Sequence, residues 1–80
     1  MELYNWSQLP LEQMNPMFAR KVIHTAQMTI ARLELRKDAV VGEHSHVNEQ
    51  VSMVERGSLK FIIDGREQIV RAGQAVATDQ

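Results

Sequence analysis

The sequence contains no cysteine, which excludes disulfide bonds and thiolate metal sites. Its net charge of −1 gives no electrostatic footprint for nucleic acid or for an anionic membrane surface. No apolar run approaches the roughly 20 residues that a membrane-spanning helix needs. The N-terminus lacks the basic and apolar regions of a secretory signal. We therefore expect a cytoplasmic protein with no nucleic-acid or membrane partner, in which any metal is held by histidine, carboxylate or amide groups.

The chain is short, and 80 residues make one domain at most. A domain of this size buries a modest core and is often stabilised by a metal ion or a partner subunit. The sequence has no glycine-rich phosphate loop, no Gly-x-Ser-x-Gly nucleophile motif and no stripe of alternating basic and aromatic residues. With these motifs absent, small-molecule or metal chemistry is the main expectation for this protein.

Residues 1–19 form an apolar N-terminal arm interrupted by Pro10 and Pro16. The arm reads as irregular, with a short helical turn over 11–15, because proline suits the first position of a helix. An apolar arm of this kind is expected to pack on a sheet face or across a homodimer.

From residue 20 the sequence consists of short segments rich in β-branched residues, separated by turn signals. The strongest turn signal is Asp64-Gly65, a dipeptide typical of tight β-hairpins. This pattern predicts an all-β sandwich or barrel over 20–80. The predicted strands cover 20–25, 28–36, 40–46, 50–55, 58–63, 67–71 and 74–78.

The segment His44-Ser45-His46 is the most informative part of the sequence. In a strand, residues i and i+2 point to the same face, so both imidazoles can converge on one point. Gln50 follows across a short bend and returns to that face by parity. Histidine nitrogens with an amide oxygen suit a divalent ion such as Mn, Fe, Co, Ni or Zn. Taken alone, a His-x-His pair is more often just two polar side chains on the protein surface.

The pattern resembles the first motif of the cupin superfamily: His-x-His, three or four residues, Glu or Gln, six residues, Gly. Here the motif would run from His44 through Gln50 to Gly57, and Arg71-Ala72-Gly73 is similar to the opening of the second motif. The resemblance implies a jelly-roll β-barrel with a metal held by His44, His46 and Gln50. The chain also resembles the small cupins of the pectin-degradation group that linearise unsaturated uronates, which carry the same His-Ser-His and Glu-Gln pattern.

Two departures from the cupin pattern matter. The usual glutamate ligand is replaced by Gln50, and parity points the neighbouring Glu49 away, as a solvated charge. A neutral amide would leave the ion a stronger Lewis acid. The resemblance also implies a fourth ligand, a histidine a few residues beyond Gln80, so the barrel reads as incomplete at its C-terminus. His24 is expected to be a surface or partly buried side chain and no substitute ligand.

Three residues are candidates for contact with a small-molecule ligand: Ser52, which shares the parity of Gln50; Phe61, which shares a face with Leu59 and Ile63; and Arg32, which would bind a carboxylate. Each has a plainer interpretation. Phe61 can simply be core, and Arg32 can face outward or lie in an interface.

Three functions stay open on the sequence. The first is a metal-dependent enzyme, an isomerase, lyase or dioxygenase, acting on a sugar acid or a related oxygenated compound. The second is a non-catalytic ligand-binding module. The third is a truncated cupin that folds as an intertwined oligomer. Fold analogy alone does not choose among them.

Overall fold

The computed structural model describes residues 1–41 and 49–78. The chain divides into two compact units, Met1–Gly42 and Glu43–Gln80, and each is described by itself. Within the described ranges the regular structure is a single 3-10 turn and seven strands, with no α-helix. The prediction of an all-β fold is therefore confirmed. None of the described residues forms a helix long and apolar enough to cross a membrane.

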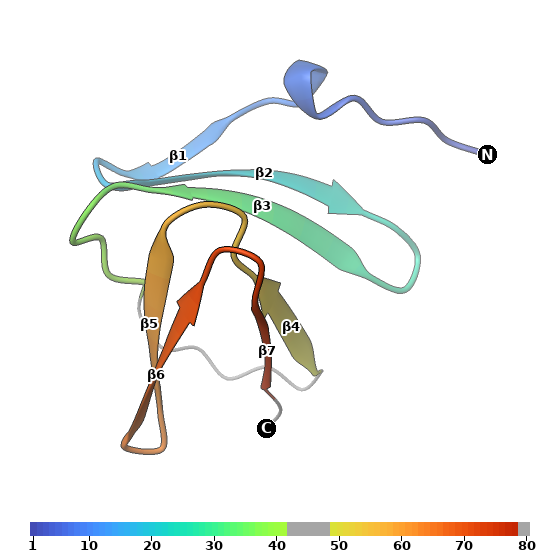
Figure 1. Cartoon of the computed structure of the whole chain (residues 1–80). Helices are drawn as coiled ribbons and strands as arrows, with labels where there is room; N and C mark the ends of the chain where they lie inside the picture. Colours follow the sequence, from blue (N-terminus) through green and yellow to red (C-terminus); the bar gives the residue numbers. More distant parts are fainter. Residues whose placement is uncertain (42–48, 79–80) are drawn as a thin grey trace. The chain divides into compact units, whose positions relative to one another are not determined.

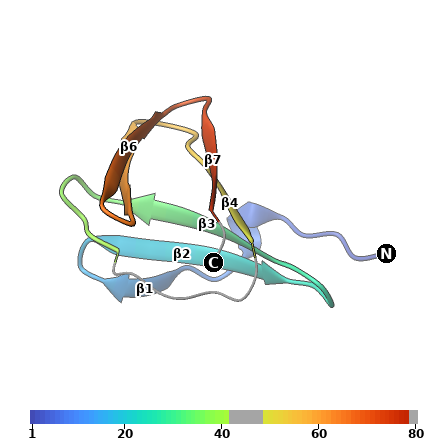
Figure 2. The ribbon, with the colours of Figure 1, turned by 90° about the horizontal axis from the view of Figure 1, so that it is seen from below.

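Unit 1 is built on an antiparallel sheet of three strands in the order β1-β2-β3 (Figures 1 and 2). The 3-10 turn η1 covers Trp6–Gln8, and the strands are β1 (Glu12–Asn15), β2 (Phe18–His24) and β3 (Thr29–Leu35). The predicted strands over 20–25 and 28–36 correspond to β2 and β3. The expectation of a helical turn over 11–15 is wrong, because β1 occupies this segment.

Local side-chain hydrogen bonds explain why a strand and a turn form where a helical turn was expected. The Asn15 Oδ1 accepts a bond of 2.8 Å from the Met17 N–H. The Gln13 Nε2 donates to the carbonyls of Asn15, at 2.7 Å, and Phe18, at 3.3 Å. Asn and Gln side chains compete in this way with helical backbone bonds. They close the turn that returns the chain to pair with β2.

One face of the unit 1 sheet carries the cross-strand pairs Ala19 with Glu34, Lys21 with Arg32 and Ile23 with Ile30. Its apolar members on β2 are the buried residues of this unit, Ala19 with 5% and Ile23 with 8% of their surface exposed. The Lys21 Nζ donates to the Trp6 carbonyl at 2.7 Å, so η1 lies against this face. The N-terminal arm therefore packs on a sheet face, as predicted.

Unit 2 consists of two antiparallel ribbons, one of β4 (Gln50–Met53) with β7 (Ala75–Thr78) and one of β5 (Ser58–Ile63) with β6 (Arg66–Arg71). These strands agree with the predicted ranges to within one or two residues at each end. The remaining predicted strand, over 40–46, lies mostly outside the described residues, and its described part, Val40 and Val41, is not a strand.

The Asp64-Gly65 turn adopts the conformation that its residues predict. Asp64 and Gly65 have φ angles of 51° and 76°, and both are positive as a type I′ hairpin requires. Asp38 also has a positive φ, of 68°. Aspartate is one of the few residues that tolerates this left-handed conformation.

The two ribbons of unit 2 are connected at one end by residues 54–57 and 72–74, and backbone bonds continue each ribbon into this joint. The Val54 N–H donates to the Gln74 carbonyl at 3.1 Å, and the Gly73 N–H donates to the Val54 carbonyl at 2.9 Å. The Ala72 N–H donates to the Gly57 carbonyl at 3.1 Å. From this joint β6 and β7 diverge (Figure 2).

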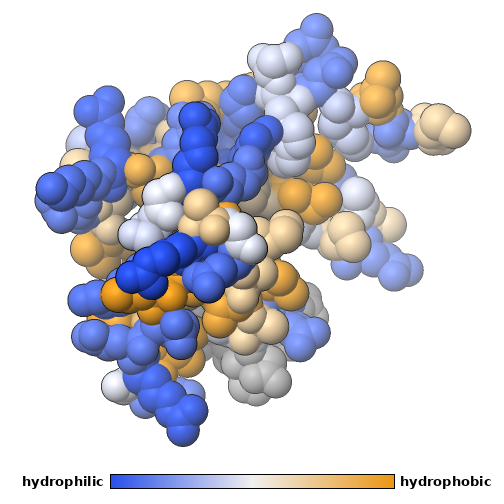
Figure 3. Space-filling view, viewed as in Figure 1, coloured by the Kyte–Doolittle hydropathy of each residue, from blue (hydrophilic) through white to orange (hydrophobic). Residues whose placement is uncertain are grey.

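One face of each ribbon is turned inward, and we call these residues the inner face of unit 2. Val70 is its most buried member, with 3% exposed, whereas Met53 and Val51 on the opposite parity are 76% and 60% exposed. Hydrophobic side chains are accordingly visible among charged ones at the surface (Figure 3). The inner face comprises Gln50, Ser52, Val76 and Thr78 from one ribbon, and Leu59, Phe61, Gln68 and Val70 from the other.

Candidate metal centre and ligand pocket

Gln50 begins β4 and lies opposite Thr78 on the inner face. Its Nε2 donates to the Ser52 Oγ at 3.0 Å. The bond ties the amide nitrogen to the next side chain on the same face, so the Oε1 remains as the atom that can accept a hydrogen bond or ligate a cation. The predicted common face of Gln50 and Ser52 is thus present in the structure.

His44 and His46, the other two predicted metal ligands, lie outside the described residues. Within 1–41 and 49–78, no group of three or more His, Asp or Glu side chains is placed to hold a metal ion. Glu49 is exposed immediately before β4. His24 is exposed at the end of β2, where its Nδ1 lies 3.1 Å from the Thr29 Oγ1. His24 is therefore a surface residue, as expected.

Ser52 and Phe61 occupy the inner face from different ribbons. Ser52 lies opposite Val76, and Phe61 lies opposite Gln68. Both are half-buried. Their cross-strand partners Val76 and Gln68 line the same pocket, so each candidate residue lies one strand away from that pocket.

Arg32, the third candidate ligand-binding residue, belongs to unit 1. Its guanidinium carbon lies 5.6 Å from the centre of the Trp6 ring, within the range of a cation–π interaction. Lys21 lies directly opposite Arg32 on the neighbouring strand. Sequence reasoning did not find the Trp6 contact, because no local pattern pairs a residue of the arm with one on β3.

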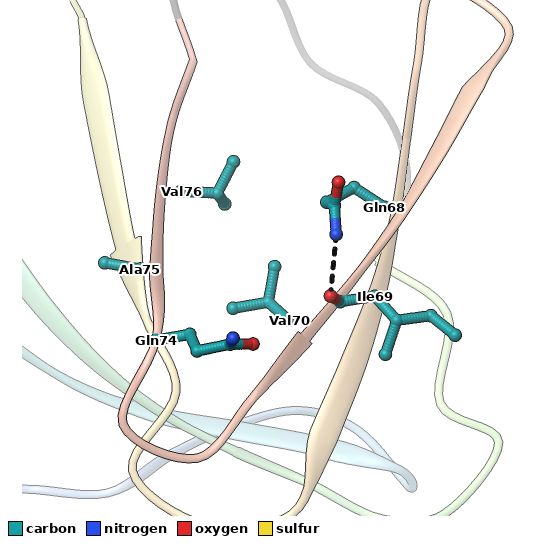
Figure 4. Close-up of a pocket in the computed structure, with 6 residues that line it drawn as sticks. All are labelled: Gln68, Ile69, Val70, Gln74, Ala75 and Val76. Atoms are coloured by element: carbon teal, nitrogen blue, oxygen red, sulfur yellow. Dashed lines mark hydrogen bonds between the residues drawn. The ribbon is translucent and has the colours of Figure 1, made fainter.

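A pocket of about 460 Å³ opens in unit 2 between β6 and β7 (Figure 4). Val70 and Val76 contribute apolar surface, and Gln68 and Gln74 contribute carboxamides. Ile69 and Ala75 complete the lining. Sequence reasoning missed both glutamines. The available signal was the parity of Gln68 with Val70, which puts this amide on the inward face of β6.

The arm holds the one ionisable group whose pKa clearly departs from its ordinary value among the described residues. The Tyr4 hydroxyl donates to the Glu2 Oε2 at 2.6 Å. This hydrogen bond, followed by the repulsion between two negative charges, raises the pKa of Tyr4. Tyr4, Glu2 and His24 also line a smaller hollow of about 350 Å³ in unit 1.

Comparison with known protein families shows which family this chain belongs to. A family model of the cupin domain matches residues 31–80, which is more than half of the chain. The chain belongs to the cupin family. No curated protein and no solved structure matches this cupin. The matched region begins within β3 and includes all the described strands of unit 2. Gln50 and the pocket therefore both lie within the cupin domain.

Proposed function

We propose that this cupin holds a divalent metal ion with His44, His46 and Gln50 and uses it to bind a small oxygenated compound such as a sugar acid. The proposal rests on the His-x-His spacing, on family membership and on the orientation of Gln50. We also propose, from the same motif, that its function is similar to that of the uronate-linearising cupins.

The observation that carries the proposal is the Gln50–Ser52 hydrogen bond of 3.0 Å. An amide ligand binds a cation through its oxygen, and a partner on the amide nitrogen orients it for that role. Ser52 is such a partner, on the same strand face. The residues at hand therefore fit a divalent ion of the imidazole-and-oxygen type. When bound, the ion would polarise a carbonyl or hydroxyl oxygen of the ligand.

The chain's own residues supply the rest of the site. Leu59, Phe61 and Val70 give the inner face an apolar part, and Ser52 gives it a hydroxyl beside the ligating amide. Small-molecule sites combine apolar surface with polar groups that fix the orientation of the ligand, and the inner face offers both. Phe61 and Ser52 are accordingly proposed as contacts of the ligand. That Arg32 binds a carboxylate stays a prediction from the sequence, since its guanidinium lies over the Trp6 ring in unit 1.

The test is metal affinity measured by titration calorimetry with Mn²⁺, Co²⁺, Ni²⁺ and Zn²⁺, with elemental analysis after mild dialysis. We expect one ion per chain. Gln50→Leu should weaken binding at least about tenfold, and Gln50→Glu should retain it because a carboxylate supplies the same oxygen. Gln27→Leu, the same change in the hairpin turn of unit 1, is the matched control and should have no effect.

A chain without stoichiometric metal, or a Gln50→Leu variant that binds as tightly as the parent, would contradict the proposal. The second candidate function is a non-catalytic ligand-binding module. Melting shifts caused by a sugar acid without any turnover of it would favour that alternative.

We further propose that the protein acts in the cytoplasm as a homodimer. The support for a dimer is the row of exposed apolar residues on the outer face of the β4–β7 ribbon, formed by Val51, Met53, Ala75 and Ala77. Sedimentation of the 80-residue chain tests the dimer, and a monomer at micromolar concentration would contradict it.

A further inference from the structure

The edge of β6 that faces away from β5 exposes backbone polar groups, and two glutamine side chains bind them. In a hairpin with a two-residue turn, residues alternate between pairs that exchange backbone bonds and pairs whose groups point outward. Ile69 and Arg71 belong to the outward class. The Gln68 Nε2 donates to the Ile69 carbonyl at 2.9 Å, and the Arg71 N–H donates to the Gln74 Oε1 at 2.9 Å.

These two bonds fix which end of each carboxamide is left for a ligand. A carbonyl only accepts, so Gln68 must present its nitrogen to Ile69 and keep its oxygen free. A backbone N–H only donates, so Gln74 must present its oxygen to Arg71 and keep its nitrogen free. Across residues 1–41 and 49–78, neither the Gln68 Oε1 nor the Gln74 Nε2 has a hydrogen-bond partner.

The pocket between β6 and β7 therefore presents one fixed acceptor and one fixed donor beside an apolar floor. The carboxamides of Gln68 and Gln74 approach from different sides, with Val70 between them (Figure 4). No charged side chain is among the residues that line the pocket. A carboxylate or ammonium group would find no countercharge among these residues, whereas a hydroxyl can accept from the Gln74 amide and donate to the Gln68 oxygen.

We propose that this pocket binds the uncharged, hydroxyl-bearing part of the ligand, with Gln68 and Gln74 as the residues that determine its specificity. The inference rests on the proposed small-molecule binding function and deepens it: a metal would hold an anionic or carbonyl oxygen, and the two glutamines would recognise hydroxyls. A volume of about 460 Å³ is within the usual range for sites of small ligands.

The test uses the full chain treated with a chelator, so that its outcome is independent of metal binding. Galactose is titrated while the methyl resonances of Val70 and Val76 are followed by NMR. We expect both to shift, and Gln68→Met and Gln74→Met each to raise the Kd about three- to tenfold, because each removes one hydrogen bond. Gln27→Met is the control with the same change outside the pocket.

A second variant separates recognition from a purely structural role. Gln74→Glu still accepts the bond from the Arg71 N–H, so the joint is kept, but it places a negative charge at the pocket. Galactose should still bind, because a hydroxyl donates well to a carboxylate, while galacturonate should be repelled. We expect the ratio of the galacturonate Kd to the galactose Kd to be more than about threefold higher in Gln74→Glu than in the parent, which equals roughly 0.65 kcal/mol.

Three results would overturn the inference: no shift of the two valine methyls with galactose, Met variants that bind as the parent does, or an unchanged ratio in Gln74→Glu. If the parent chain binds galactose but takes up no stoichiometric metal ion in the separate metal titration, the proposed metal centre is refuted and the pocket inference stands. The reverse result would refute the pocket alone.

Discussion

The two units of this cupin use their sheet faces differently. In unit 1 the face with Lys21 and Arg32 is covered by the chain's own arm, which contributes the Trp6 ring and carbonyl. In unit 2 the inner face has polar groups set among apolar ones, and Val70 is its one buried member, with 3% of its surface exposed. The comparison suggests that unit 1 is organised for stability, whereas unit 2 gives up packing to keep amides and a hydroxyl accessible.

The largest effect should come from the buried residues of unit 1. Ile23→Ala removes a side chain that is 8% exposed and should lower the free energy of unfolding by about 2 kcal/mol. Its cross-strand partner Ile30 is 46% exposed, so Ile30→Ala should cost less than about 1 kcal/mol. Urea denaturation followed by Trp6 fluorescence measures both. Equal costs would show that the arm does not shield this face.

Unit 2 is best probed at its tight turn. Gly65 has a φ of 76° with open space around its Cα, so Gly65→Ala adds backbone strain without a steric clash. We expect a loss of about 1 kcal/mol, seen as a lower melting temperature. Asp64→Asn is the control and should be neutral or slightly stabilising, because Asn-Gly suits the type I′ turn. A neutral Gly65→Ala would mean that the register of β5 and β6 does not depend on this turn.

The contact between the arm and the sheet should contribute less. Arg32→Gln removes the cation over the Trp6 ring and should lower the stability of unit 1 by about 0.5 kcal/mol. The value lies at the low end because Lys21, directly opposite, repels the guanidinium. Trp6 is the only tryptophan, so its emission spectrum reports the contact directly. An emission spectrum identical to that of the parent would contradict the stacking, and Arg32→Lys should preserve part of it.

The smallest effect concerns the first residues of the arm and involves a proton. Glu2→Gln removes the carboxylate that raises the pKa of Tyr4, so this pKa should fall toward its ordinary value of 10.0. Tyr4 is the only tyrosine, and its ultraviolet absorbance can be titrated without interference from others. An unchanged titration would indicate that the arm leaves this conformation in solution.

The strands of unit 2 were predictable because their signals are local. The Asp64-Gly65 turn fixes the register of β5 and β6, and parity along each strand then assigns Phe61 and Ser52 to the inward side. The contacts of the arm were not predictable in this way. Strand β1 forms through pairing with β2, and the Trp6–Arg32 contact joins residues that no short pattern relates.

The candidate site shows the same division. The sequence pattern predicts Gln50 as a ligand and places Ser52 on the same face by spacing. The structure contains the hydrogen bond between these two side chains, and the ligand role of Gln50 stays a prediction. Gln68 and Gln74 escaped notice because they bond to the edge of β6 that, among the described residues, pairs with no other strand, and this edge exists only once β5 and β6 have paired. The sequence around a glutamine in a strand does not show whether its amide will bind the backbone of a strand edge or water.

Gln74 takes part in three bonds at once. Its N–H donates to the Arg71 carbonyl at 2.9 Å, its carbonyl accepts from the Val54 N–H, and its side-chain oxygen accepts from the Arg71 N–H. Gln74, which presents a donor to the pocket, therefore also bonds to a residue of one ribbon and to a residue next to the other, and helps to fix the joint between them. For protein engineering this means that ligand preference and ribbon geometry cannot be altered independently at position 74. A designer who wants a new specificity should change Gln68 first and restrict position 74 to side chains that keep an acceptor there.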